Sequence, residues 1–318
     1  AWDGQVNADG DGALCNEDKV RLRRAFGDCS MVSLVQEPGG TAKVFRAHAN
    51  LIDSRVGPLP LPFFVKFDRW DKIGRELRNY QECTTLHIPF NQRPNLDHGR
   101  CALGLKRGVI VGNFVEQSEP LQAMVDRGTG RAALYSLFDG ALRGWRRQAY
   151  YDDARYVETR SLLDGMALCC PSQYSRRRQD VLRSHALQAQ NHHGTKLPFE
   201  ELERRLRSIP PIRHRRTLTH GDLHGQNVRV TGQHAILIDF ASVIDGPLVA
   251  DPASLDISLV MDTTAISGSQ WDIAAAALYK LSALRALPPP PRPADVGAHL
   301  VDANRFIRQM GLSDQLGD

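Results

Sequence analysis

The sequence predicts an α+β protein in which a small antiparallel sheet precedes a larger helical region. Short runs of β-branched and aromatic residues alternate with turn residues between positions 31 and 116. After Gln117, helical periodicity dominates for about a hundred residues. A β-hairpin pattern then returns at residues 228–238, inside the helical part.

Length and composition fit a globular protein. The chain has 318 residues, of which 42% are hydrophobic, enough for one large domain or two modest ones. No apolar run of about 18 residues and no signal-peptide pattern occurs, so we expect no membrane span. The six cysteines are scattered without a CxxC pair, as expected for reduced thiols in a cytoplasmic protein. The sequence opens on Ala1 rather than methionine, which leaves open a longer natural chain.

Residues 1–27 are predicted to form a leader and a helix. Residues 17–26 have helical spacing, and Gly27 ends it. Within residues 7–18, oxygen-bearing side chains occupy the EF-hand positions one, three, five and twelve, with Gly12 at the sixth. Only six residues precede this segment, and its twelfth position is Asp18 rather than Glu. A flexible acidic leader is therefore favoured, with calcium binding as the alternative.

Residues 28–117 are predicted to form the small sheet. Strand patterns cover residues 31–35, 43–47 and 62–67, and a tight turn at 37–40 joins the first two. A helical segment at 72–83 follows, and then a strand at 108–116. This order predicts a sheet with one helix packed against it.

Residues 118–318 are predicted to form a helical lobe. The hairpin inside it pairs residues 228–230 with 235–238 across the turn 231–233. PPPPRP at 288–293 is a stiff spacer. The helical segments are 131–145, 154–168, 199–207, 270–287 and 294–310.

Two nearby segments carry the side chains that phosphoryl transfer needs. They are LTHGDLHGQNV at residues 218–228 and AILIDF at residues 235–240. One carboxylate must orient the attacking hydroxyl and accept its proton, while an amide and a second carboxylate hold magnesium on the nucleotide phosphates. Asp222, Asn227 and Asp239 fit these three demands. Oxygen-only ligands also suit Mg²⁺.

HGDLHGQN with LIDF resembles the catalytic loop and metal-binding motif of the aminoglycoside phosphotransferase and choline kinase family, which has a protein-kinase-like fold. The resemblance implies a two-lobed chain that uses ATP and Mg²⁺, with Asp222 as the catalytic base and Asn227 and Asp239 as metal ligands. Gly221 and His224 stand where protein kinases have Arg and Lys, which points toward the small-molecule branch. His220 is expected to support the loop, and His224 to support it or to contact phosphate or substrate.

The resemblance also implies a nucleotide site in the small lobe. Lys66 ends the apolar run LPFFVK and would bind the α- and β-phosphates, while Glu76, ten residues later, would hold it. The turn containing Gly39, Gly40 and Thr41 would cover the phosphates, with a plain hairpin turn as the alternative.

The expected hinge is residues 114–118, where Glu116, Gln117 and Ser118 would read adenine through backbone groups. Further along, Asp251 and Asp256 resemble the segment in which a buried aspartate braces the catalytic loop. The segment is longer here than in the family, so the role of each aspartate stays open.

The function implied is an ATP- and Mg²⁺-dependent phosphotransferase acting on a hydroxyl of a small molecule, such as a sugar, a metabolite or an aminoglycoside. Residues 118–217 would hold the acceptor. They contain carboxylates and aromatic side chains, Trp145, Tyr150 and Tyr151 among them, but more arginines, so a neutral or anionic acceptor fits as well as a cationic one.

The alternatives are a pseudokinase or nucleotide sensor, or a protein Ser/Thr kinase, within a larger bacterial signalling or defence protein. The arginine clusters are interpreted as solvated helix faces, so we expect no nucleic-acid partner. The oligomeric state stays open.

Overall fold

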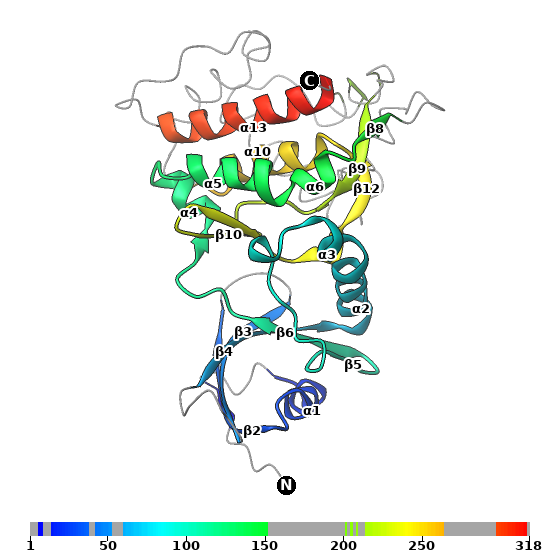
Figure 1. Ribbon diagram of the computed structural model, residues 1–318, viewed down its shortest axis with the longest axis vertical. Coiled ribbons are helices and arrows are strands. Elements are labelled where there is room, and N and C mark those ends of the chain that lie inside the picture. Colours follow the sequence, from blue (N-terminus) through cyan, green and yellow to red (C-terminus); the bar gives the residue numbers. More distant parts are fainter. Residues whose placement is uncertain are drawn as a thin grey trace. The chain divides into compact units, whose positions relative to one another are not determined.

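The computed structural model describes residues 6–8, 14–37, 42–52, 60–151, 201, 204–205, 208, 214–263 and 297–316 (Figure 1). The chain divides into two compact units. Unit 1 comprises Ala1–Ala123, Ala132–Arg143 and Gln226–Ser242, and unit 2 comprises Met124–Arg131, Gly144–Gly225 and Val243–Asp318. Several predicted segments lie outside the described residues: the glycine turn with Gly39, Gly40 and Thr41, the helices at 154–168 and 270–287, the proline spacer, and most of 199–207.

A six-stranded sheet forms the centre of unit 1, in the order β1-β2-β3-β4-β6-β5. β1 pairs with β2 in parallel, and the other neighbours are antiparallel. The four longer strands confirm the predicted ones, and β6 ends before the expected hinge. The bounds are β1 Val6–Ala8, β2 Cys29–Gln36, β3 Lys43–Leu51, β4 Leu61–Arg69, β5 Ala102–Leu103 and β6 Arg107–Asn113.

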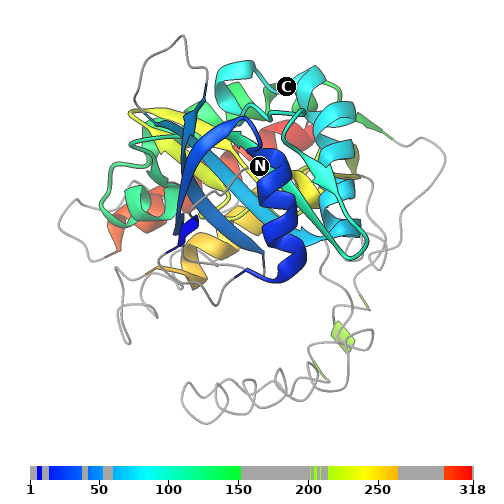
Figure 2. The ribbon, with the colours of Figure 1, turned by 90° about the horizontal axis from the view of Figure 1, so that it is seen from below.

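The two faces of this sheet have different coverings because strand side chains alternate in direction. One face is covered by α1 (Asn16–Ala25), which lies across the blue strands in Figure 2. Here Leu22 and Phe26 join the apolar residues of the strands in one buried cluster. Phe26 meets Phe63 of β4 edge to face, with 5.5 Å between ring centroids. The opposite face carries Lys66.

A helix follows β4 directly, as predicted. α2 (Trp70–Asn79) continues through a π-helical turn at Tyr80–Thr84 into α3 (Thr85–His87). Ile73 and Glu76 are the buried positions of α2, one turn apart, so both face the sheet. A short 3₁₀ turn at Phe90–Gln92 follows.

The predicted hairpin is confirmed and belongs to unit 1. β10 (Val228–Thr231) pairs with β11 (His234–Leu237) across a turn in which Gly232 has φ +62°. β7 (Glu119–Pro120) extends β10 on its other side. The chain then enters a 3₁₀ turn at Phe240–Ser242.

Residues 121–146 are helical, as expected, but broken into short pieces. They are α4 Leu121–Asp126, α5 Arg131–Ser136, a π-helical turn at Leu137–Ala141 and α6 Arg143–Arg146.

Unit 2 contains a three-stranded antiparallel sheet in the order β12-β9-β8 and two long helices. α10 and α13 run side by side (Figure 1). The Asp256 carboxylate of α10 binds them together by accepting hydrogen bonds from Asn304 and Arg308 of α13. The bounds are β8 Tyr150–Tyr151, β9 Arg215–Thr219, β12 Ile244–Pro247, α10 Ala250–Met261 and α13 Ala298–Leu316.

The predicted fold class, α+β with a small antiparallel-sheet lobe and a larger helical lobe, is confirmed. The lobe boundary at residues 117 and 118 stays a prediction. Within the described part of the chain, no helix is both long and apolar enough to cross a membrane.

Candidate active site

Lys66 and Glu76 form a buried ion pair on the open face of the unit 1 sheet. Lys66 Nζ donates to Glu76 Oε2 at 2.8 Å, and the two side chains are 10% and 9% exposed. On β4, the Lys66 side chain points to the face opposite α1, and on α2 the Glu76 side chain points toward the sheet. The structure therefore brings these two predicted residues together.

The same ammonium also contacts Asp239, whose Oδ1 lies 2.8 Å from Lys66 Nζ. Burial works against the charge on Lys66, but Glu76 and Asp239 outweigh it and raise the lysine pKa. Burial raises the pKa of Glu76 to about 7, although Lys66 pulls it down. One cation between two carboxylates is suited to receive the further negative charge of a phosphate chain.

Asp239 has a left-handed backbone, with φ +65°, which is uncommon for a residue other than glycine. Such a conformation costs free energy and persists only where the surroundings hold it. Asn79 at the end of α2 supplies that support, because its Nδ2 donates to the Phe240 carbonyl at 2.9 Å. Tyr80 packs against the Phe240 ring, with 6.1 Å between centroids. Helix α2 thus holds both Glu76 and the turn that carries Asp239.

Asn227 lies beside this turn, at the open end of the β10–β11 hairpin. Its carbonyl accepts a hydrogen bond from the Ile238 N–H at 3.0 Å, one residue before Asp239, and its side chain is buried. Asn227 offers an amide oxygen and Asp239 a carboxylate that is 37% exposed, and hard oxygen donors of this kind are those that Mg²⁺ uses with water and phosphate ligands. The donor chemistry of Asn227 and Asp239 therefore fits the expected metal.

Residues 114–118, the expected hinge, form hydrogen bonds with one another and with Arg229. The Phe114 carbonyl accepts the Glu116 N–H at 3.1 Å, and the Val115 carbonyl accepts the Ser118 hydroxyl at 2.7 Å. Arg229 of β10 donates to both the carbonyl and the hydroxyl of Ser118. Glu116 and Gln117 are exposed, and Gln117 has φ +53°.

In unit 2, Asp251 braces the start of the expected catalytic loop. Its carboxylate accepts the His220 N–H at 2.7 Å and the Gly221 N–H at 3.1 Å. Burial raises the pKa of Asp251, against His220 and the two N–H groups, which lower it. Gly221 has φ +74°, a conformation that glycine adopts without strain. The open question about the two aspartates is thereby answered, because Asp251 holds the loop and Asp256 holds α13.

The rest of the loop alternates buried and accessible side chains. His220 and Leu223 are fully buried, Asp222 is exposed and His224 is half-buried. The Gly225 N–H donates to the Ser258 hydroxyl of α10 at 3.3 Å. Residues of α10 therefore hold the loop by hydrogen bonds, while the side chain of Asp222, the predicted base, stays accessible. The burial of His220 agrees with a supporting role.

Other predicted features take structural positions. The carboxylate of Asp18, the twelfth position of the alternative calcium loop, is fully buried and accepts hydrogen bonds from Arg107 and the Cys15 N–H. Trp145 is also buried, with its backbone carbonyl accepting the Thr217 hydroxyl. No group of three or more His, Cys, Asp or Glu side chains that could hold a metal occurs among the residues described.

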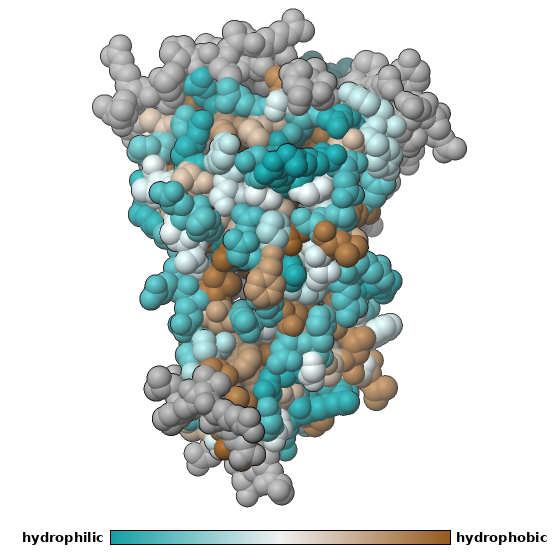
Figure 3. Space-filling view, viewed as in Figure 1, coloured by the Kyte–Doolittle hydropathy of each residue, from teal (hydrophilic) through white to brown (hydrophobic). Residues whose placement is uncertain are grey.

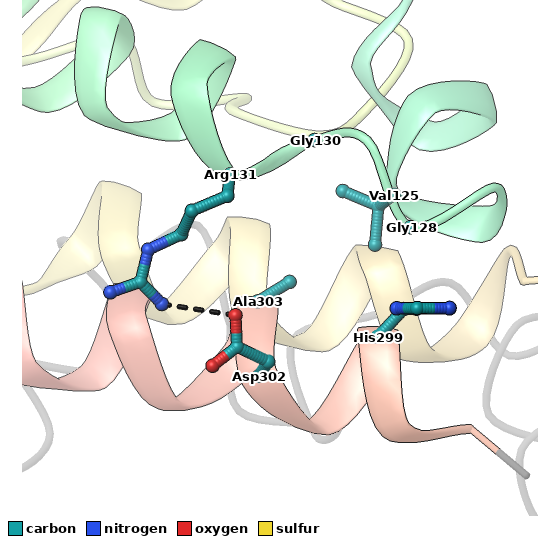
Figure 4. A pocket seen from close by; sticks show the side chains of 7 residues that line it. All are labelled: Val125, Gly128, Gly130, Arg131, His299, Asp302 and Ala303. Carbon is teal, nitrogen blue, oxygen red and sulfur yellow. Dashed lines mark hydrogen bonds and ion pairs between the residues drawn. The ribbon is translucent and has the colours of Figure 1, made fainter. Parts of the chain in front are cut away.

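Unit 2 contains a small cavity of its own. It measures about 30 Å³ and is lined by Val125, Gly128, Gly130, Arg131, His299, Asp302 and Ala303 (Figure 4). This volume accommodates about one water molecule, so neither a nucleotide nor an acceptor fits it.

Two supporting residues, Asn79 and Arg229, escaped the sequence analysis. Each acts on a segment far away in the chain, Asn79 on residue 240 and Arg229 on residue 118. A single asparagine in a helix and a single arginine in a strand carry no local pattern that marks such contacts.

Comparison with known proteins gives one family model and several solved structures. The model, described as Ternary complex associated domain 9, matches residues 147–288. No curated protein matches the chain. Similar solved structures include a choline kinase from Cryptosporidium parvum Iowa II, at 14% identity and a TM-score of 0.40, covering 89% of this chain and 82% of that one.

Two further similar structures are also kinases. An amicoumacin kinase in complex with AMP-PNP, Ca²⁺ and Ami has 12% identity and a TM-score of 0.39, covering 93% of this chain and 94% of that one. A glucosamine kinase has 12% identity and a TM-score of 0.38, covering 89% of this chain and 82% of that one. At these low values the similarity assigns no residue role and no ligand to this chain.

Proposed function

We propose that the protein is an ATP- and Mg²⁺-dependent phosphotransferase that transfers the γ-phosphate to a hydroxyl of a small molecule. The observation that carries the proposal is the buried Lys66 ammonium, 2.8 Å from both Glu76 and Asp239. A structural ion pair needs one carboxylate. The second carboxylate is held in a left-handed turn beside Asn227, which is an arrangement for binding a charged ligand.

Each residue of unit 1 has a distinct task in this proposal. Lys66 binds the α- and β-phosphates, and Glu76 keeps its ammonium in place. Asn227 and Asp239 hold Mg²⁺, which when bound would neutralise charge on the phosphate oxygens. The base of the nucleotide lies against residues 114–118.

Asp222 is the proposed catalytic base. Its exposed carboxylate orients the acceptor hydroxyl and takes its proton as the oxygen attacks the γ-phosphate. The buried Asp251 keeps the loop rigid by fixing the two backbone N–H groups before Asp222. A rigid loop matters because such catalysis depends chiefly on positioning and on electrostatic stabilisation.

We propose a neutral or anionic hydroxyl compound as the acceptor, such as a sugar or a metabolite. A cationic acceptor calls for carboxylates or an aromatic cage. Trp145, one of the candidate aromatic residues, is buried and unavailable for a cage, and the ring of Tyr151 already lies against a cation, the Arg215 guanidinium, at 5.9 Å. The candidate carboxylates at 152, 153, 158 and 164 lie outside the described residues.

A second candidate function is a kinase-like module, either a nucleotide sensor or a protein Ser/Thr kinase, within a larger bacterial signalling or defence protein. The match of residues 147–288 to Ternary complex associated domain 9 does not distinguish the two candidates. The two candidates differ in acceptor, so phosphate transfer from γ-labelled ATP to panels of small molecules and of proteins separates them.

Thermal denaturation with ATP, with and without Mg²⁺, tests the nucleotide site first. A ligand that binds only the folded chain stabilises it by about 2.7 kcal/mol at a hundred times its Kd. We expect Mg²⁺ and ATP together to raise the Tm of the wild type, Asp239→Asn to lose the Mg²⁺-dependent part, and Lys66→Met to lose most of the ATP effect. No ATP-dependent rise in the wild type would refute the proposal.

A further inference from the structure

A row of side chains crosses the sheet of unit 1 next to Lys66. The strand register aligns one residue from each of β2, β3, β4 and β6, namely Val35, Arg46, Phe64 and Gly112. The neighbouring row contains Lys66, two residues along the strand and therefore roughly 6.8 Å away. Both rows lie on the face that α1 leaves open. If the phosphates lie at Lys66, the row with Arg46 lies where the base end of a nucleotide would be.

Two contacts hold the Arg46 side chain at this place. Its guanidinium carbon lies 4.4 Å above the centroid of the Phe114 ring, at the start of the hinge. Its Nη2 donates to Glu37 Oε1 at 3.1 Å. Its Nε is buried with no hydrogen-bond partner among the described residues. The side chain nevertheless stays 42% exposed, so part of the guanidinium is accessible to a ligand.

Several of the backbone groups that could read the edge of a base already take part in one hydrogen bond each. The carbonyls of Phe114, Val115 and Ser118 already accept hydrogen bonds from the Glu116 N–H, the Ser118 hydroxyl and Arg229. Adenine and guanine differ in donors and acceptors along their edges, so a protein tells them apart by edge hydrogen bonds. Stacking does not tell them apart, because every base has a π-face and an arginine plane can stack on any of them.

We propose that Arg46 holds the nucleotide base by stacking its guanidinium on it, and that the site therefore binds adenine and guanine nucleotides with similar affinity. The proposal rests on the proposed function, since it concerns the base of the nucleotide whose phosphates lie at Lys66.

Isothermal titration calorimetry on the full chain tests this with ATP, GTP and inorganic tripolyphosphate, each with Mg²⁺. We expect the Kd values of ATP and GTP to agree within about threefold, as for stacking without edge reading. Arg46→Ala should weaken both nucleotides by about tenfold and tripolyphosphate by less than about threefold, because only the nucleotides have a base to lose. Arg46→Lys keeps the charge but not the plane, so it should also weaken both nucleotides.

Arg131→Ala in unit 2 is a closely matched control. Arg131 pairs with Asp302 at 3.1 Å (Figure 4). It also stacks on Phe306 at 4.4 Å, so both distances equal those of Arg46. Its loss removes an equivalent surface arginine and should leave all three affinities unchanged. A parallel loss of affinity in this control would attribute the Arg46 effect to general destabilisation and overturn the assignment.

Other outcomes separate the two proposals. ATP binding more than about thirtyfold tighter than GTP would show edge reading and overturn the inference while leaving the phosphotransferase intact. The same follows if Arg46→Ala weakens tripolyphosphate as much as ATP, because Arg46 would then act on phosphate. If the wild type binds no nucleotide at all, the proposed function fails and the inference fails with it.

Discussion

The buried carboxylate of Glu76 should make the stability of the chain depend on pH. Burial raises the pKa of Glu76 from 4.5 to about 7 in the folded protein. The folded state therefore binds more protons than the unfolded state between these values, and stability falls as pH rises. The contribution is fully present below pH 4.5 and is lost as pH rises through about 7. The two pKa values differ by about 2.5, which corresponds to about 3 kcal/mol.

Glu76→Gln removes this titration while keeping the shape of the side chain. Urea denaturation of the wild type and the variant at several pH values between 4.5 and 8 gives the difference in their unfolding free energies at each pH. We expect the wild type to lose about 3 kcal/mol relative to the variant across this range. Taking the difference cancels the titrating groups that do not interact with Glu76, since the two proteins share them.

Glu82→Gln is the control, because Glu82 lies on the same helical segment with its side chain exposed. This variant should follow the wild type at every pH. A wild-type advantage over Glu76→Gln that stays constant or grows as pH rises would refute the reasoning. Attraction to Lys66 would then outweigh burial in setting the charge of Glu76.

Three further predictions concern the groups that hold the site. Asp251→Asn replaces one of the two carboxylate oxygens that accept the His220 and Gly221 N–H groups by an N–H donor. It should lower the unfolding free energy, measured by urea denaturation, by about 2 to 3 kcal/mol. A loss below about 0.5 kcal/mol would contradict the role of Asp251 in holding the loop. Gly221→Ala places a Cβ at φ +74° and should cost about 1 to 2 kcal/mol, seen as a lower Tm, and an unchanged Tm would argue against that conformation. Asn79→Ala removes the bond to the turn of Asp239 and should weaken apparent Mg²⁺ affinity in the presence of ATP, whereas an equal affinity would show that the turn holds without it.

Local patterns were sufficient to predict much of unit 1. Short β-branched and aromatic runs between turn residues predicted β2, β3 and β4, and the short turn fixed the register of the β10–β11 hairpin. The separation of ten residues between Lys66 and Glu76 spans a strand end and two helical turns, so a pair across this distance was predictable once both elements were assigned.

Unit 2 was harder to predict because its signals are weak or depend on distant contacts. β9 begins with Arg215 and Arg216, whose charges conceal a strand in which only alternate residues are buried. α10 opens with Asp251 and Pro252, which suggest a turn rather than a helix, although proline is tolerated in a first helical turn. The two residues of β8 are too short to leave a periodic pattern.

The contacts that support the catalytic loop were also beyond prediction from local sequence. Its string of polar residues identified Asp222, Asn227 and Asp239 as candidates, but not what supports them. Asp251 contacts the loop across thirty residues of sequence, and only the fold shows which of the two candidate aspartates does so.

The central claim, that Asp222 transfers a proton in a phosphotransferase site, is tested most directly by the rate of Mg²⁺-dependent ATP turnover in Asp222→Asn. The variant keeps the shape of the side chain and removes the base. We predict that turnover falls by about a hundredfold or more, with the Kd of ATP unchanged within about twofold. Full turnover in the variant would contradict the account.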